Sequence, residues 1–497
     1  MVGKAFFENI GESLNPVFVK EMRQYFQNRR MVIFMGLLLI AQFVVALFFS
    51  SAMTLDADGD EGVAFFLLII FAGAGLSILL CSIGAEQRFA EERSDKELNY
   101  SMLTTLKPSA VILGKLEGAM VMILCIFSML LPFLTAAYFM RGLSAASLLV
   151  TLCLFPVLVL YALAGIFAGS FGQKWITVLF IVGIFNSAFG VVPAAFSIID
   201  ELMGASTIAS EFWITVLVEY EIAFLIGILF FLLSLAVVSP PKSNRLLPSK
   251  VYLFALPLLS LLLMLPFYLV YGPADFPPDV FFFIEFAFCF FSVSVLGIVA
   301  IFEMPTNSIR VYLKCPRGFI GRFLHFVFST GFSGSLILAF LLLAIPVALY
   351  KFGNLTVNET SHLCGFGCIL VSFLGYVVLS LILSWETRLP MPAWLWVVIL
   401  VVAGNIAGWI PVALNAGDLD GLPDVVRVAG MAVSQTYAFA EIFEEEIEIT
   451  SAAMFASLAV TSVLFLFLMP AIVRAFKQHR RPDTGAVKPP TREMLGK

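Results

Sequence analysis

Long hydrophobic stretches separated by short polar segments dominate the chain. Twelve of them approach or exceed the roughly 20 apolar residues that a helix needs to cross the hydrocarbon core of a bilayer. We predict about twelve transmembrane helices, with eleven or thirteen as the alternatives if neighbouring boundaries merge or divide. The stretches lie at 31–51, 62–84, 118–140, 144–170, 175–196, 222–238, 251–271, 280–301, 326–350, 363–384, 392–414 and 450–473.

Composition favours lipid over water as the environment of these helices. The 497 residues are 61% hydrophobic and 13% charged, with a mean hydropathy of +1.00. A soluble domain carries roughly 25% charged residues. The apolar surface of this chain, which includes 52 Phe, exceeds what a soluble core of this size could bury. The chain is therefore predicted to be an all-α integral membrane protein.

The positive charges predict the orientation. If the N-terminus is cytoplasmic, 26 of the 29 Lys and Arg fall on the cytoplasmic side of the twelve spans. Only Arg141, Lys351 and Arg427 fall outside. Cytoplasmic loops carry an excess of Lys and Arg, so the reverse orientation is disfavoured. Both termini are predicted to be cytoplasmic.

The spans can be divided into two halves of six, at 31–240 and 251–473, followed by a basic cytoplasmic tail at 474–497. The fifth span of each half carries a similar phrase, NSAFGVVP in the first and NIAGWIP in the second. This similarity suggests an internal duplication. The alternative is that Asn, Gly and Pro are simply common where membrane helices pack and bend. The candidate pathway or hinge residues are Asn186, Gly190, Pro193, Asn405, Gly408 and Pro411.

The N-terminal segment 1–30 contains a predicted amphipathic helix. Asn15 can cap a helix whose first residue is Pro16, a favoured N-terminal arrangement. Such a helix should lie along the cytoplasmic membrane surface with its apolar side down. A basic flank that only sets topology is the alternative. The apolar face comprises Leu14, Phe18, Met22, Tyr25 and Phe26, and the polar face comprises Lys20, Arg23, Gln24 and Asn28.

The cytoplasmic loop 89–116 has a distinctive order of charges and turn residues. Its charged start, 91–97, is predicted to extend the second span as a helix beyond the membrane. Pro108 disfavours helix at Lys107, so the chain should turn at 104–108 and re-enter through 109–115. A protruding helix of mixed charge suits docking onto a partner. A solvated connector is the alternative.

Together these two segments resemble the ABC-2 type permease family of ATP-binding-cassette transporters. The resemblance is good over 11–140, fair to 238 and poor beyond 250. Residues matching the family's amphipathic "elbow" helix are Asn15, Pro16, Phe18, Lys20, Glu21 and Arg23. Residues matching its coupling loop are Glu91, Glu92, Arg93, Glu97, Leu98, Leu103, Thr104, Thr105, Lys107, Pro108, Gly114 and Lys115.

The resemblance implies a permease subunit that moves an unidentified substrate, by export, across the cytoplasmic membrane of a bacterium. It implies that loop 89–116 docks onto a separate ATPase subunit, which binds the ATP and magnesium. A second copy of this chain or a second permease is a further expected partner. Family members usually have six spans, so loop 303–325 is either a second, degenerate docking loop or part of an unrelated membrane domain.

Several chemistries are not expected in this chain. It has no GxxxxGK[ST] phosphate loop, so it is not predicted to be an ATPase or another enzyme, and it should bind no cofactor of its own. No nucleic-acid partner is expected. The three histidines, His325, His362 and His479, are scattered, and Cys364 and Cys368 near His362 are interpreted as packing residues. No metal site is therefore predicted.

Carboxylates near the membrane bear on the alternatives. Glu219 and Glu221 should lie at the outer interface, with 212–218 as a short re-entrant or interfacial helix, because a charge at mid-bilayer costs roughly 3 kcal/mol. A proton or ion site there is the alternative. Glu285 is expected to snorkel to the outer surface.

The rival functions are a secondary transporter, a membrane scaffold or assembly protein, and a membrane enzyme acting on lipid-linked substrates. The neutral mid-span groups Asn186 and Asn405 count against ion coupling.

Overall fold

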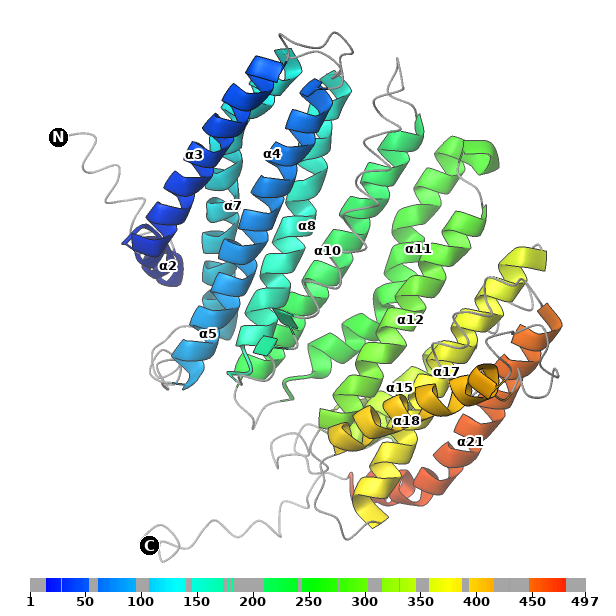
Figure 1. Ribbon diagram of the computed structural model, residues 1–497. Helices are drawn as coiled ribbons and strands as arrows, with labels where there is room; N and C mark the ends of the chain where they lie inside the picture. The colour runs from blue at the N-terminus through cyan, green and yellow to red at the C-terminus, as the bar shows by residue number, and fades with distance from the viewer. Residues whose placement is uncertain are drawn as a thin grey trace, which may run out of the picture. The chain divides into compact units, whose positions relative to one another are not determined.

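The computed structural model divides the chain into two compact units, Met1–Ser239 (unit 1) and Pro240–Lys497 (unit 2). All regular elements in the described ranges are helices (Figure 1). The structure describes residues 15–27, 29–52, 61–94, 107–139, 145–172, 177–178, 180–181, 210–239, 244–275, 278–302, 315–329, 331–345, 357–386, 393–414, 429 and 447–479.

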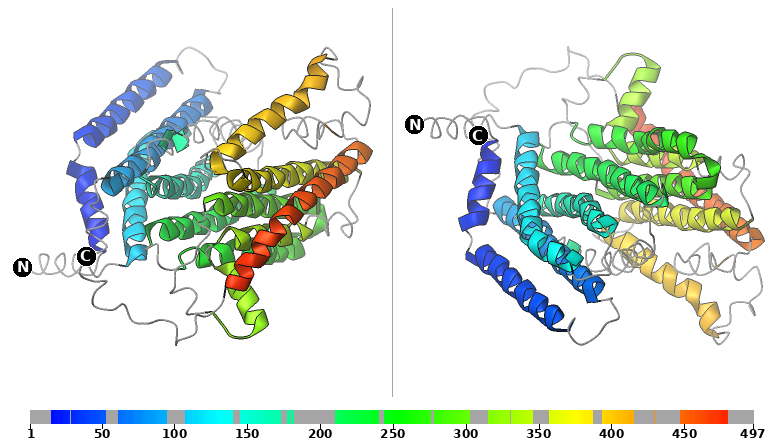
Figure 2. Two further views of the ribbon diagram at one scale, coloured as in Figure 1. Left: turned by 90° about the horizontal axis from the view of Figure 1, so that it is seen from below. Right: turned by 90° about the horizontal axis from the view of Figure 1, so that it is seen from above.

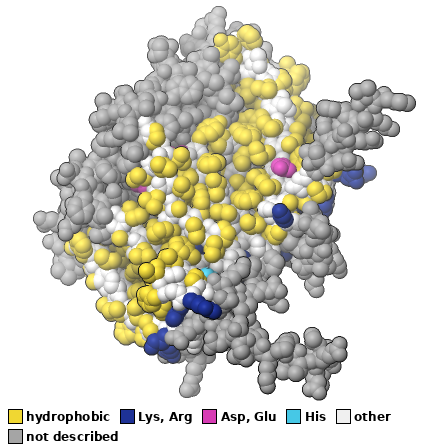
Figure 3. All heavy atoms as spheres, turned by 180° about the vertical axis from the view of Figure 1, so that it is seen from behind, with side chains coloured by type: hydrophobic (Ala, Val, Ile, Leu, Met, Phe, Trp, Pro, Cys, Tyr) yellow, Lys and Arg dark blue, Asp and Glu magenta, His cyan; other side chains and the backbone are white. Residues whose placement is uncertain are grey.

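Six helices of the described part are long and apolar enough to cross a membrane, or up to eight if each of two bent helix pairs is one span. Hydrophobic side chains cover most of the coloured surface in Figure 3, and charged side chains are few there. The all-helical, multi-pass architecture expected from the sequence is thereby confirmed. The count of twelve and the cytoplasmic placement of the termini stay predictions.

Unit 1 begins with a short helix joined to a long one at a bend. The axis of the first helix differs by 60° from that of residues 32–48, and Figure 2 shows the two as separate blue ribbons. The described helices of this unit are α2 (Pro16–Gln27), α3 (Arg29–Ala52), α4 (Glu61–Ser77), the π-helix η1 (Ile78–Ile83), α5 (Gly84–Ser94), α7 (Pro108–Phe139), α8 (Ala145–Gly169) and α10 (Ser210–Val238).

The charged start of loop 89–116 continues the second hydrophobic stretch as a helix. α4, η1 and α5 follow one another without interruption from Glu61 to Ser94, which confirms the predicted helical extension as far as Ser94; its position beyond the membrane stays a prediction. The chain re-enters helix at Pro108, the first residue of α7, where its missing N–H removes no helical hydrogen bond. Two helical stems therefore flank residues 95–106.

Helix α8 packs closely on η1 and α5 through two glycines. A Cβ atom on Gly165 would lie 2.3 Å from the backbone oxygen of Ser82, and one on Gly169 would lie 2.5 Å from that of Glu86. The Ser82 hydroxyl donates a hydrogen bond to the Tyr161 carbonyl (2.6 Å). Small residues allow the backbones of membrane helices to approach in this way. The α5 stem is thus held firmly against α8.

The short interfacial helix predicted at 212–218 is wrong. α10 runs without a break from Ser210 to Val238, and Glu221 within it is buried. The segment FWITVLVEYEIAF contains no Gly or Pro, so nothing in the local backbone ends the helix. A carboxylate raises the cost of burial but does not itself break a helix.

Unit 2 is built around a tightly packed pair, α17 and α21. Cys368 and Ser372 of α17 both lie against Ser457 of α21, with sulfur–oxygen and oxygen–oxygen distances of 3.3 and 3.4 Å. Cys368 is thus a packing residue, as the sequence indicated. The helices of this unit within the described residues are α11 (Leu247–Asp275), α12 (Pro278–Phe302), α14 (Phe319–Phe328), α15 (Phe332–Leu342), α17 (Val357–Glu386), α18 (Ala393–Leu414) and α21 (Ile447–Gln478).

The stretch 326–350, predicted as one span, contains a helix bend near its start. α14 ends at Phe328 and α15 begins at Phe332, and the two helices meet at 95°. Gly331 has φ of 151°, a backbone conformation that side-chain-bearing residues rarely adopt. The buried Lys250 ammonium donates hydrogen bonds to the carbonyls of Ser329 (2.7 Å) and Gly331 (3.3 Å). A basic side chain from α11 thus caps the end of α14.

Replacing Lys250 with Met should destabilise unit 2 by about 1 kcal/mol, because two carbonyls at the break lose a charged donor while the removal of a buried ammonium offsets part of the loss. The thermal unfolding midpoint of the full chain in detergent measures this. Lys477→Met, at an exposed lysine, is the control and should leave the midpoint unchanged. Equal midpoints for the two variants would contradict the capping role.

Glu285 does not snorkel to a surface. It lies on α12 with 4% of its area exposed, and its carboxylate accepts a hydrogen bond from the Ser260 hydroxyl of α11. The hydroxyl supplies a donor that the apolar surroundings would otherwise lack, so the side chain stays inside the helix packing.

Candidate functional site

The amphipathic helix α2 starts as the sequence predicted. The Asn15 side-chain oxygen accepts a hydrogen bond from the Val17 backbone N–H (3.1 Å), and Pro16 is the first helical residue. The Asn15 amide nitrogen also donates to the Ala110 carbonyl in the first turn of α7 (2.6 Å). One side chain therefore caps α2 and joins it to the second stem, α7, of loop 89–116.

Helix α2 lies directly on α7 because two glycines leave room for it. A Cβ atom on Gly114 would lie 2.8 Å from the backbone nitrogen of Phe18. One on Gly118, one helical turn later, would lie 3.2 Å from Cβ of Glu21. The spacing of four places both glycines on one face of α7. This glycine face sets how closely α2 approaches α7.

Four charged side chains meet where α2, α5 and α7 come together, and we call them the four-charge cluster: Lys20, Glu21, Glu92 and Lys115. The Lys115 ammonium donates to the Glu21 carboxylate and contacts Glu92 Oε2 at 2.8 Å. The Lys20 ammonium donates to the other oxygen of Glu92 at 2.7 Å. Two cations and two anions balance in charge.

Burial makes the inner half of this cluster the stronger part. The side chains of Lys115 and Glu21 are each 5% exposed, whereas that of Lys20 is 46% exposed. A buried ion pair is sustained only when its charges are matched and hydrogen-bonded. An exposed pair is screened and contributes little. Lys115, which bridges Glu21 and Glu92, is therefore the central residue.

The buried face of α2 differs from the apolar face that the sequence indicated. Glu21 and Tyr25 are the buried residues of the helix, and Phe26 is 55% exposed. The difference arises because α2 packs one side on α7, where Lys115 makes burial of a carboxylate favourable. These contacts do not test the predicted position of α2 along a membrane surface, which stays a prediction.

Aromatic side chains enclose the cluster. The Arg88 guanidinium lies over the Tyr25 ring at 3.7 Å, and Lys115 Nζ lies 4.8 Å from the centre of the Phe89 ring. Such contacts are favoured by the negative face of the ring. Phe89 is fully buried with Ile112 of α7 and Ile166 of α8 in one hydrophobic cluster. The base of the loop is a packed core rather than an exposed connector.

The charged residues at the two stems differ in how exposed their side chains are. Glu91 and Lys107 are exposed and flank the segment 95–106. Glu92 faces the cluster, and Arg93 packs against Gly172 just after α8, where an added Cβ would lie 3.0 Å from Arg93 Cγ. Of the charged residues predicted to contact a partner, Glu91 and Lys107 therefore have the most accessible described side chains.

Several predicted site residues lie outside what can be described. Asn405, Gly408 and Pro411 are placed on α18, but their side chains are outside the described part, so the pathway or hinge prediction is not tested. The residues outside the described ranges are Glu97, Leu98, Leu103, Thr104, Thr105, Asn186, Gly190 and Pro193.

Sequence reasoning assigned Glu21 and Lys115 to separate motifs and missed that they pair. It also missed Arg88 and Phe89, which pack around the cluster. The available signal was the pattern Gly114-Lys-x-x-Gly118, which puts one cation between two glycines on the face that a neighbouring helix can approach. The partner carboxylate lies 94 residues earlier in the chain.

The cluster joins elements mechanically rather than activating a group for reaction. Its two ammonium groups are neutralised by its two carboxylates, so it presents no excess charge to a ligand. What the arrangement can do is make α2 follow any movement of α5 and α7.

Comparison with protein-family models, with curated proteins and with solved structures gives no match in any of the three.

Proposed function

We propose that the chain is the permease subunit of an ABC transporter of the ABC-2 type, driven by ATP hydrolysis in a separate subunit. The observation that supports this most is the four-charge cluster. It connects the elbow-like helix α2 with both stems of the loop that resembles a coupling loop. A docking loop needs such a connection if force applied to it is to reach the membrane helices.

In this proposal, closure of the ATPase dimer presses on residues 95–106. The stems α5 and α7 transmit that movement, and the Lys115 links to Glu21 and Glu92 make α2 move with them. α2 leads directly into α3, so the displacement continues into the spanning helices. The equilibrium between access states shifts only if the ATPase docks with different affinity in the two states.

The partner ATPase would bind ATP and magnesium, and this chain would act without cofactors. The proposed location is the cytoplasmic membrane of a bacterium, with export of an unidentified substrate as the direction of transport. A second copy of the chain, or a second permease, would complete the pathway if one chain supplies only half of it.

The proposal is tested by purifying the complex from its native host in mild detergent and measuring co-purified protein and ATP hydrolysis. A P-loop ATPase should co-purify in stoichiometric amount. Glu91→Ala combined with Lys107→Ala should release it, because both side chains are exposed and flank residues 95–106, on which the ATPase is proposed to press. The variant should unfold at the same temperature as the native chain, since neither residue belongs to the four-charge cluster.

Glu117→Ala combined with Lys477→Ala is the matched control, because it removes one exposed acid and one exposed base that do not flank residues 95–106. It should retain the ATPase. A pure preparation that contains no ATPase under conditions that keep other transporters intact would refute the proposal. Equal loss of ATPase in the control would show that the effect is nonspecific.

One observation favours a second candidate, an ion-coupled secondary transporter. Glu285 is buried between α12 and α11 with the Ser260 hydroxyl as its donor. Ionisable groups inside membrane helices are costly and commonly mark ion or proton pathways. The purification separates the two functions, because an ion-coupled transporter requires no ATPase partner.

A further inference from the structure

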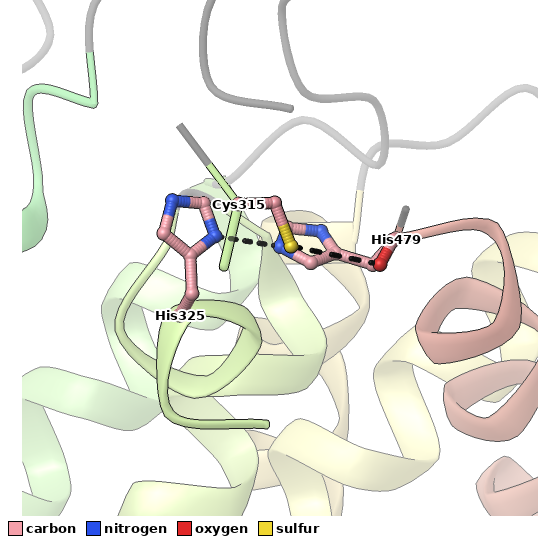
Figure 4. Close-up of side chains that lie close together, drawn as sticks. All are labelled: Cys315, His325 and His479. Atoms are coloured by element: carbon pink, nitrogen blue, oxygen red, sulfur yellow. Dashed lines mark hydrogen bonds between the residues drawn. The ribbon is translucent and has the colours of Figure 1, made fainter. Parts of the chain in front are cut away.

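Three side chains able to bind a metal ion meet in unit 2, although the sequence separates them widely. Cys315 precedes α14, His325 lies within α14, and His479 directly follows α21. Figure 4 shows the His325 ring and the Cys315 sulfur both turned toward the His479 ring. No metal site was predicted here, because 154 residues separate the two histidines.

The ligand atoms are close together. His325 Nδ1 lies 2.8 Å from His479 Nε2, and the Cys315 sulfur and these two nitrogens all lie within 4.8 Å of one another. Cys315 and His479 are 2% and 1% exposed, while His325 is partly exposed. The three residues thus form a buried group that is open on one side.

These distances fit a tetrahedral zinc site after a small adjustment. Zinc binds thiolate at about 2.3 Å and imidazole at about 2.0–2.1 Å, which places tetrahedral ligands about 3.3–3.6 Å apart. The two nitrogens need to separate by only about 0.5 Å, and the sulfur need only move closer.

The scaffold around the cluster holds α14 against α21. The Arg322 guanidinium donates to the Phe476 carbonyl (2.9 Å) and lies 4.4 Å from the centre of the Phe476 ring. The Phe326 ring contacts the rings of both Phe476 and His479, at 5.3 and 5.4 Å. Both histidines are therefore positioned by packing before any ion binds, which lowers the entropic cost of binding.

The donor types also agree with zinc. One thiolate with two imidazoles suits Zn²⁺, and three protein ligands leave a fourth position for water or another group.

We propose that Cys315, His325 and His479 bind one Zn²⁺ ion, which fastens α14 to the end of α21. The proposal does not depend on the proposed transport function. A hydrogen bond between the two imidazoles would by itself explain their contact. The Cys315 thiol donates a hydrogen bond to the His479 backbone carbonyl (3.9 Å), and zinc would in addition use the sulfur and both nitrogens, which all lie within 4.8 Å of one another.

The test uses the full chain purified in detergent without a polyhistidine tag. Elemental analysis after dialysis against buffer with micromolar zinc and then against zinc-free buffer should find about one zinc per chain. Cys315→Ser, His325→Gln and His479→Gln should each lower zinc content at least about tenfold, since each removes one of three ligands. His362→Gln and Cys125→Ser are the matched controls and should retain zinc.

Cobalt supplies a readout that does not depend on any variant folding. Adding Co²⁺ to the native chain should produce a thiolate-to-cobalt charge-transfer band and intense tetrahedral d–d bands, and Zn²⁺ should abolish both. The charge-transfer band should be absent in Cys315→Ser. Absence of these bands in the native chain, or equal zinc in all variants, would overturn the proposal.

Discussion

Replacing Lys115 with Met should destabilise unit 1 by about 3–5 kcal/mol, the cost typical of breaking a buried ion pair by removing one partner. Lys115 neutralises Glu21 and shares Glu92 with the more exposed Lys20. Without it, the Glu21 carboxylate stays buried with no cation beside it in the cluster. Thermal or denaturant unfolding of the full chain in detergent measures the change.

A second substitution separates loss of the pair from loss of packing. Lys115→Met combined with Glu21→Leu removes both buried charges and should recover at least half of the lost stability, because replacing a whole buried pair with apolar groups is often nearly neutral. Lys477→Met serves as the control at an exposed lysine. If Lys115→Met unfolds like the control, the cluster does not hold α2 in place.

The same variants connect stability with the proposed function. In the double variant α2 can still pack on α7 and Lys20 can still pair with Glu92, but the charged link of α7 to Glu21 and Glu92 through Lys115 is gone. If a partner ATPase is present, we expect it to bind normally while its hydrolysis becomes less dependent on substrate. Binding reports docking, and substrate-stimulated hydrolysis reports transmission through the stems.

Replacing Gly114 with Ala should destabilise unit 1 by about 2–3 kcal/mol, in the upper part of the range for overpacking. The added methyl group would lie 2.8 Å from the Phe18 backbone nitrogen and 2.8 Å from Val17 Cβ. A backbone atom cannot rotate away, so α2 must move off α7. That movement would stretch the Asn15 hydrogen bond to Ala110.

The sign of this effect is informative, because Gly→Ala in a helix normally stabilises by up to about 1 kcal/mol. Gly75→Ala in α4 is the matched control, since a Cβ there meets nothing within 4 Å. It should raise the unfolding midpoint slightly or leave it unchanged, while Gly114→Ala lowers it. A stabilising Gly114→Ala would show that α2 does not pack on α7 as described.

Local signals in the sequence were sufficient wherever a helix end depends on its own neighbours. Asn15 and Pro16 place the start of α2, and Pro108 places the start of α7, because capping and the missing proline N–H act within one turn. Hydropathy likewise identified the long apolar helices, since the cost of placing side chains in lipid is summed residue by residue.

Local sequence signals did not predict the helix breaks correctly where some residues favour a break and their neighbours favour a continuous helix. Glu219 and Glu221 suggested a helix break that α10 does not have, because the segment contains no Gly or Pro to end the helix and neighbouring helices can reduce the cost of burying a carboxylate. At 329–331 the reverse holds. Ser329 and Gly331 weaken the helix locally, and Lys250, 79 residues earlier, completes the break.

By itself the sequence determined that the chain is an all-helical, multi-pass protein, and it drew attention to the elbow-like and loop segments. Only the tertiary structure decided which charges pair and which ligands meet. Glu21 reaches Lys115 across 94 residues, and His325 reaches His479 across 154. The reason is physical: helix formation and hydropathy are set within a few neighbouring residues, whereas the pairing of buried polar groups depends on the packing of whole helices.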